Sequence, residues 1–314
     1  MARATSPRDR QRFGIGEWYG RLFHGLTLAE RQGFATLAGL PKSQQTQQPC
    51  PFQGEGLAAP CTKQGGVCSV RRYVEYAEIG RVEVAPGQAG RLRAVCPYRF
   101  REAGLIYRWA GEVLLDAPEP IVVNEVAFLR STAGDGEGAD AAEDVGRIDQ
   151  VLIRQGSQPL EWCALEIQAV YFSGASMGRD FAAIRRHASE TLPFPSGQRR
   201  PDYRSSGPKR LMPQLQIKVP TLRRWGKKLA VVVDRDFFAA LAPMDRVSDI
   251  SNCDIAWFIV DFIEGLDGKA QLARGDVHLT TLERAVEGLT AGIPVSKNEF
   301  ERRILAKLTR RVAA

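Results

Sequence analysis

The chain has 314 residues, of which 44% are hydrophobic and 25% are charged, as is usual for a globular protein with one large domain or two smaller ones. Its net charge of +7 favours a polyanionic partner such as nucleic acid. No run of about 18 apolar residues is present, so we expect no membrane span, and the basic N-terminus lacks the apolar segment of a secretory signal. These features predict a cytoplasmic protein, in which clustered cysteines more often hold metals than form disulfides.

The N-terminal third combines short regular elements with a long irregular segment. Thr27 followed by Glu30 is a capping-box pattern and predicts the start of a short helix. Residues 41–68 are rich in Pro, Gly and Gln and have no hydrophobic periodicity. A segment of this length needs a bound group or a crosslink to be ordered. Strand-like runs follow at residues 71–84 and 90–100. We therefore expect an irregular N-terminal region that depends on a bound group or a crosslink.

Four of the six cysteines lie in or near this irregular segment, at Cys50, Cys61, Cys68 and Cys96. Their spacing is not that of a zinc finger with two Cys-x-x-Cys pairs, but four thiolates suit a closed tetrahedral site for Zn²⁺ or iron. Such a metal would hold in place a loop that has too few apolar residues to form a hydrophobic core. Disulfides and free structural thiols are the alternatives. The remaining two, Cys163 and Cys253, lie in apolar runs and are expected in the core.

The middle of the chain predicts a strand pair. An apolar run, Val122–Leu129, is interrupted by Glu125. Residues 132–144 contain five acids and no base, which predicts a solvated loop. Two apolar runs, 147–155 and 160–172, are then joined by a short Gly/Pro turn, which is typical of a β-hairpin.

The second of these runs carries the candidate catalytic residues. A strand over Glu161–Phe172 has period two, so Glu166 and Gln168 share one face, and Asp149 on the preceding strand lies within reach. Buried carboxylates repel each other and lose hydration, and a divalent cation removes both costs. Mg²⁺ with open water positions would hold a scissile phosphate and activate a water. The alternative is that Asp149 caps a turn and Glu166 pairs with an arginine.

Glu125 is a third candidate acid, because it interrupts an apolar run and precedes Asp149. It would help to hold a second metal or orient a water. The alternative is an ion pair at the end of an element.

Residues 199–228 carry ten basic residues and a single acid, Asp202. Lys and Arg neutralise phosphates, and Gln and Arg read base edges in the major groove, so this segment is a candidate contact with double-stranded DNA. A solvated charged face is the alternative. The candidate contact residues are Arg210, Gln214, Gln216, Lys218, Arg223 and Arg224.

The last third predicts buried strands and helices. Residues 175–190 look helical, residues 227–244 predict a buried strand that runs into a helix, and residues 253–265 predict another buried strand. Thr280 with Glu283 and Ser296 with Glu299 each begin a C-terminal helix. Strands interspersed with helices, several apolar on both faces, predict an α/β fold with a central mixed β-sheet flanked by helices.

With these residues identified, the chain resembles the NotI-type restriction endonucleases, a branch of the PD-(D/E)XK nucleases. The resemblance rests on the order of three features: the four cysteines, the set formed by Asp149, Glu166 and Gln168, and the basic segment 208–228. Together with the stretches around them, these features extend over about residues 14–234.

The resemblance implies a restriction-endonuclease-like fold and a homodimer that cuts duplex DNA at a GC-rich palindrome with Mg²⁺, in a restriction-modification system. It assigns Asp149 and Glu166 to Mg²⁺, Gln168 to the position of the motif lysine, and Glu125 to an accessory acid. It also implies iron rather than zinc in the four-cysteine site. We accordingly expect residues 1–110 to form a metal-binding and DNA-recognition region and residues 111–314 to form the catalytic domain.

Two other functions are compatible with the same residues. One is a non-catalytic, repressor-like DNA-binding protein with a thiolate-bound metal. The other is an RNA-processing or DNA-repair nuclease. A protein that only binds DNA has no need of an acid pair on one strand face, so this pair is the feature that distinguishes the hypotheses.

Overall fold

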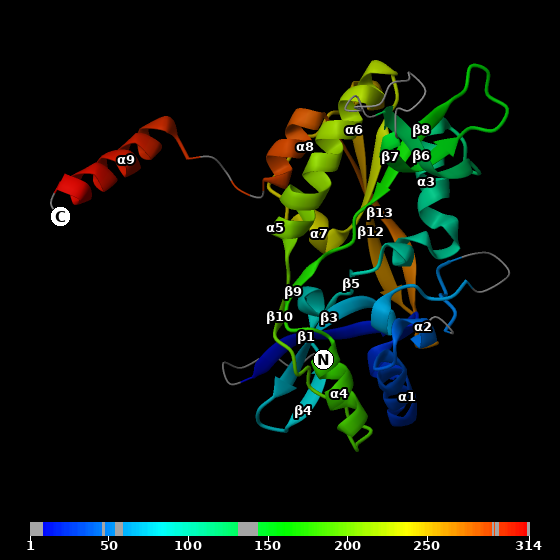
Figure 1. Cartoon of the computed structure of the whole chain (residues 1–314), viewed down its shortest axis with the longest axis vertical. Helices are drawn as coiled ribbons and strands as arrows, with labels where there is room; N and C mark the ends of the chain where they lie inside the picture. The colour runs from blue at the N-terminus through cyan, green and yellow to red at the C-terminus, as the bar shows by residue number, and fades with distance from the viewer. Residues whose placement is uncertain are drawn as a thin grey trace, which may run out of the picture.

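The computed structural model describes residues 9–45, 48–53, 59–130, 144–290, 292 and 295–312. Figure 1 shows two sheet-containing parts along the longest axis, one built around the N-terminal strands and the other around the central and C-terminal strands. Helix α9 (Lys297–Val312) projects to one side of the second part. None of the helices in these ranges has the length and apolarity that a bilayer span requires.

The larger part contains a six-stranded sheet. Strand β11 is parallel to both of its neighbours and the other pairs are antiparallel, which confirms the predicted mixed sheet. The predicted hairpin is also confirmed, because β7 and β8 are antiparallel neighbours. The strands lie in the order β13 (Ala270–Thr280), β12 (Ile255–Glu264), β11 (Leu229–Asp234), β8 (Trp162–Ile167), β7 (Asp144–Ile153) and β6 (Ile121–Arg130).

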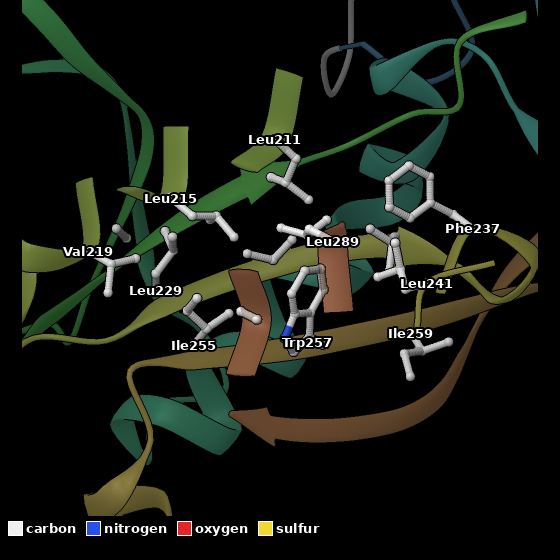
Figure 2. Close-up of a cluster of buried hydrophobic side chains, with 14 of the residues drawn as sticks. Leu211, Leu215, Val219, Leu229, Phe237, Leu241, Ile255, Trp257, Ile259 and Leu289 are labelled. Carbon is white, nitrogen blue, oxygen red and sulfur yellow. The ribbon is translucent and has the colours of Figure 1, made fainter. Parts of the chain in front are cut away.

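Helices cover both faces of this sheet, as predicted. Leu215 and Leu222 of α6 pack with Val231 of β11 in one apolar cluster, which is drawn in Figure 2. Trp109 of α3 packs with Leu165 of β8 in a second cluster on the opposite face. Truncating a fully buried leucine such as Leu215 to Ala would cost about 2–5 kcal/mol. The first face carries α5 (Tyr203–Ser206), the π-helical turn Gly207–Leu211, α6 (Met212–Arg224), α7 (Arg235–Ala239) and α8 (Leu282–Leu289), and the second carries α3 (Leu105–Leu115).

The smaller part is built on an antiparallel sheet in the order β2-β1-β3-β4, with β5 also paired to β3. Trp18 and Tyr73, both buried, fill its core together with Phe181, which comes from much later in the chain. Its elements are β1 (Arg10–Trp18), β2 (Arg21–Leu22), α1 (Leu28–Ala38), α2 (Lys42–Gln45), β3 (Val67–Tyr76), β4 (Arg81–Val84) and β5 (Arg93–Ala94).

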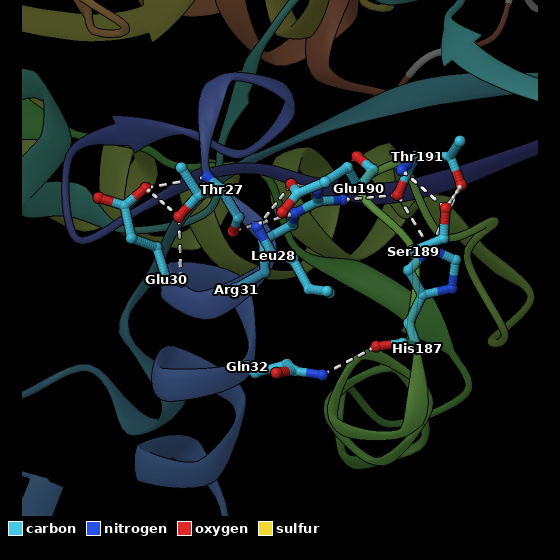
Figure 3. Close-up of polar contacts among 9 residues, drawn as sticks. All are labelled: Thr27, Leu28, Glu30, Arg31, Gln32, His187, Ser189, Glu190 and Thr191. Carbon is cyan, nitrogen blue, oxygen red and sulfur yellow. Dashed lines mark hydrogen bonds and ion pairs between the residues drawn. The ribbon is translucent and has the colours of Figure 1, made fainter.

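A segment that follows the β7–β8 hairpin returns to this smaller part. Strands β9 (Phe172–Gly174) and β10 (Arg199–Pro201) form a two-stranded ribbon, and α4 (Gly178–Arg186) packs beside α1. Figure 3 shows the polar contacts at this junction, where the Arg31 guanidinium donates to the carbonyl oxygens of Glu190 and Thr191. The smaller part is therefore assembled from two segments that are far apart in sequence.

Arg99 connects the two parts of the molecule. It lies in the 3₁₀ segment Pro97–Gly104, is fully buried, and pairs with Glu17 of β1 at 2.9 Å. Its guanidinium also donates to the carbonyl oxygen of Ala270 in β13 at 2.8 Å and lies over the rings of Phe52 and Phe262. A buried charge is tolerated only when it is paired and hydrogen-bonded, so this junction requires all of these partners.

Several local predictions are confirmed. The Thr27 hydroxyl accepts from the backbone N–H of Glu30, and the carboxylate of Glu30 accepts in return, so the capping box begins α1 as expected. Ser296 accepts from the N–H of Glu299 at the start of α9. The cap of α8 is Thr281 rather than Thr280, because the Thr281 side chain accepts from Arg284.

Other predictions were wrong in detail. The strand expected at Glu161–Phe172 ends at Ile167, because the chain then leaves the sheet and the N–H of Val170 donates to Ala94 in the smaller part. The run 90–100 contributes only Arg93–Ala94 to a sheet before the 3₁₀ segment. Of the expected acidic loop, residues 132–143 lie outside the described ranges, and Asp144 is the first residue of β7.

Candidate active site

The register of the β7–β8 hairpin brings two carboxylates together. Gln150 pairs with Leu165 and Val151 with Ala164, so the next position in this register sets Asp149 opposite Glu166. Val151 and Ala164 belong to the apolar cluster beneath α6, whereas Leu165 belongs to the cluster beneath α3. Because alternate residues share a face, Asp149 and Glu166 both project toward α6.

A lysine from α6 lies between these carboxylates. The Lys218 ammonium contacts the Oε1 atom of Glu166 and lies 3.6 Å from the Oδ1 atom of Asp149. The side chain of Glu166 is only 2% exposed, whereas that of Asp149 is 59% exposed. The group therefore extends from the buried sheet to the protein surface.

Burial dominates the electrostatics of Glu166. It raises the pKa of the Glu166 carboxyl to about 7, the Lys218 ammonium acts in the opposite direction, and Asp149 raises the pKa further. Burial disfavours the charged carboxylate, and a bound cation would offset this cost, so this position suits a ligand for a metal.

The other two predicted acid-site residues have different partners. Gln168 follows β8 directly, and its amide donates to the carbonyl oxygen of Ala169 at 2.6 Å. The register on both sides of Glu125 sets it opposite Asp149, but its side chain is 72% exposed and pairs with Arg147 at 3.3 Å. Of the four residues predicted from the sequence, only Asp149 and Glu166 share a direct partner.

The sequence interpretation did not anticipate the position of Lys218, which it grouped with the DNA contacts. A signal for burial was present, because Leu215, Lys218 and Leu222 follow helical spacing on the apolar face of α6. The charge run 199–228 obscured this signal, since most of its basic residues are exposed or only partly buried.

The other candidate DNA contacts lie on or next to α6 with varied partners. The Arg210 guanidinium lies over the ring of Tyr171 at 4.5 Å. Arg223 pairs with Asp254 and Glu283, and Arg224 donates to the Thr221 hydroxyl at 3.1 Å. Gln214 is partly buried, and Gln216 is exposed on the same helix.

The four predicted cysteines lie buried, with reduced thiols. Cys50, Cys61 and Cys68 form one cluster with Phe52, and the rings of Tyr19 and Tyr98 pack on it. A hydrogen bond from the Cys61 thiol lowers the pKa of Cys50 to about 6 and raises the pKa of Cys61. Burial raises the pKa of Cys68 and of Cys96, with neighbouring cysteines adding to both. The four sulfurs are thus close enough to influence one another.

The backbone around the cluster is tightly constrained. Gly66, which immediately precedes β3, has a φ of +67°, and a Cβ there would lie 2.1 Å from the Tyr19 ring. Only glycine tolerates both conditions. Within the described ranges, however, no group of three or more His, Cys, Asp or Glu side chains is arranged to hold a metal ion. The cysteines are gathered, but they do not form a preorganised ligand set.

Comparison with known families agrees with this arrangement. The model for the family described as restriction endonuclease NotI matches residues 36–272, which include the four cysteines, both carboxylates and the basic segment. A search of curated proteins found no match. Because the family match covers most of the chain, the protein belongs to the NotI restriction endonuclease family and is a type II site-specific nuclease, a hydrolase that acts on DNA.

Proposed function

We propose that the chain cuts both strands of duplex DNA at a GC-rich palindrome in a Mg²⁺-dependent reaction, as the nuclease of a cytoplasmic restriction-modification system. The observation that carries the proposal is the pairing of buried Glu166 with exposed Asp149 on one face of the hairpin. Keeping a carboxylate almost fully buried is costly, and the cost is understandable where a cation and a phosphate must meet.

Asp149 and Glu166 would hold the Mg²⁺. Carboxylate oxygens are hard ligands, and the exposure of Asp149 leaves room for water and a phosphate oxygen. When bound, Mg²⁺ would supply an activated water and charge stabilisation for phosphodiester hydrolysis. Gln168 would act as a hydrogen-bonding neighbour at the end of β8, and Glu125 as a peripheral acid.

The basic segment would contact the DNA. Of its candidate contacts, Gln214 and Gln216 lie on α6, the helix that also carries Lys218. Arg210, Arg223 and Arg224 would contact phosphates or base edges. Because a palindrome has twofold symmetry, a homodimer would present one active site to each strand.

The four cysteines would hold a structural iron, with zinc as the alternative. Three of them already share one buried cluster, and the low pKa of Cys50 favours a thiolate there. Small movements of the side chains would complete a tetrahedral set. We assign residues 1–110 to this metal-binding and recognition region and residues 111–314 to catalysis. Elemental analysis of protein purified without added metal should find one transition metal per chain, and its absence would refute the site.

The first experiment is a digest of unmethylated DNA rich in GC palindromes, with Mg²⁺ or with EDTA. We expect discrete fragments only with Mg²⁺, and we expect Glu166→Ala to abolish them while leaving DNA binding intact. Binding without fragments would favour the repressor-like alternative. Preferential cutting of RNA or single strands would favour a processing or repair nuclease.

A further inference from the structure

The carboxylate pair is bridged by a cation that does not come from the catalytic strand. Lys218 lies 52 residues after Glu166 in sequence, on α6, and its ammonium reaches both carboxylates. Gln168, which follows β8 directly and was predicted to share a face with Glu166, has no charge. Among the described residues that form ion pairs with Asp149 or Glu166, Lys218 is the cation.

The surroundings of Lys218 argue on energetic grounds against a purely packing role. Its neighbours at helical spacing, Leu215 and Leu222, are buried in the apolar cluster, and an apolar residue would fill this position at lower cost. A lysine there must give up most of its hydration, since its side chain is 8% exposed. The carboxylate pair compensates for this loss, and the ammonium in turn reduces the repulsion between the carboxylates.

The ammonium also lies where the reaction would generate negative charge. In phosphodiester hydrolysis the oxygen of a water bonds to phosphorus, the bond to the leaving oxygen breaks, and the proton released by the water reaches the leaving oxygen through solvent. Negative charge grows on the phosphate oxygens during this step, and a fixed cation beside them lowers the barrier. Asp149 is exposed, so substrate and solvent reach the group from its side.

We propose that Lys218 is a catalytic residue: it holds Asp149 and Glu166 together while no metal is bound, and with Mg²⁺ held by these carboxylates it would stabilise the charge that develops on the scissile phosphate. This inference rests on the proposed nuclease function. Lys218 stays an ammonium throughout and exchanges no proton with the substrate.

The test replaces Lys218 with Met, which keeps the length of the side chain and removes its charge. With saturating Mg²⁺ and prebound DNA, we expect the single-turnover cleavage rate of Lys218→Met to fall by about 10²–10³-fold. The affinity for DNA in Ca²⁺ should change by less than about threefold, because the ammonium acts mainly on the negative charge that develops in the transition state. Lys297→Met, on exposed α9, is the control that removes a charge far from the carboxylates and should cut at the wild-type rate.

A second readout does not depend on cleavage. Without metal, Lys218→Met should have a lower Tm than wild type, because two carboxylates then face each other unpaired. Added Mg²⁺ or Ca²⁺ should restore its Tm, and at a lower half-saturating concentration than in wild type, because no ammonium competes for the site. A merely structural lysine would give a loss of Tm that divalent cations do not correct.

The outcomes separate this inference from the proposed function. If wild type cuts and Lys218→Met cuts within about threefold of it, the inference is wrong and the proposed function stands. If wild type cuts no nucleic acid, both fail. Should Lys218→Met not fold, Lys218→Gln, which keeps a donor to Glu166 without a charge, is judged by the same rate criterion.

Discussion

The β7–β8 hairpin and the cysteine cluster both bring together groups that prefer to be apart, but they do so by different means. In the hairpin, strand register sets Asp149 opposite Glu166, and Lys218 supplies the compensating charge from within the chain. In the cysteine cluster, Cys50 and Cys61 come from an irregular segment and Cys68 from the start of β3, and burial raises the pKa of Cys68 and of Cys96. A regular element fixes its site before any ligand arrives, whereas a loop needs the ligand to complete it.

This difference predicts opposite consequences for losing a residue at each site. Replacing an acid of the hairpin should lower activity without destabilising the fold, whereas replacing a cysteine of the cluster should destabilise it. The following variants test the comparison, beginning with the largest effect.

Asp149→Asn should lower the cleavage rate by on the order of 10³-fold, because a metal ligand contributes several kcal/mol to the transition state. Its Tm should stay close to that of wild type, since the Asp149 side chain is 59% exposed. Rates come from a time course on a defined DNA site, and Tm from circular dichroism. Glu161→Ala, which removes an exposed acid at the other end of the hairpin, is the control and should cut normally. Cleavage by Asp149→Asn at the wild-type rate would remove this residue from the site.

Cys61→Ala should behave in the opposite way. Loss of one thiolate should release the structural metal and lower the Tm by roughly 10 °C or more, at about 2–4 °C for each kcal/mol lost. Cys163→Ala is the matched control, because Cys163 is equally buried but lies in the apolar cluster beneath α3. Metal content by elemental analysis should fall only in Cys61→Ala. An equal loss of Tm in both variants, with no metal in wild type, would show that the cysteines of the cluster only contribute to packing.

Asp234 offers a pH test at the junction of the two parts. Its buried carboxylate accepts from the N–H groups of Ala94 and Phe237, and burial raises its pKa to about 7. Between about pH 4 and pH 7 the folded state therefore holds this proton more tightly than the unfolded state, so stability should fall as pH rises through that range. The expected contribution is a few kcal/mol. The free energy of unfolding of Asp234→Asn, measured in urea, should depend less on pH than that of wild type. An unchanged dependence would exclude Asp234 as the source of the effect.

Glu125→Gln should have the smallest effect. The side chain is 72% exposed and its ion pair with Arg147 lies at the surface, where such pairs contribute at most about 1 kcal/mol. We expect cleavage to fall by less than about tenfold and Tm to stay unchanged. A loss as large as that of Asp149→Asn would show that Glu125 turns toward the metal when DNA binds.

Local patterns in the sequence were sufficient to predict much of the larger sheet. Period-two alternation separated the faces of the hairpin, so Ala164 and Leu165 lie in different apolar clusters as expected. Capping residues located the start of α1. These features depend on neighbours in the chain, and a single sequence contains that information.

Contacts between distant segments could not be read in the same way. Lys218 reaches Glu166 across 52 residues, and the return of Phe181 to the N-terminal core spans more than a hundred. Helical spacing places Lys218 on the apolar face of α6, but only tertiary packing shows which carboxylates it reaches. For the same reason the candidate site was predicted as three acids, Asp149, Glu166 and Glu125, and the amide of Gln168, without its cation.

The Arg99 junction has a consequence for engineering enzymes of this kind. One guanidinium simultaneously contacts the first strand, the ring of Phe52 in the cysteine-bearing loop, and the hairpin of β12 and β13. Exchanging the N-terminal part between relatives to alter target specificity would therefore separate this side chain from Phe262 and Ala270. Chimeras that take Glu17, Phe52, Arg99 and Phe262 from the same parent should express as folded protein. Chimeras that take some of these residues from each parent should not fold.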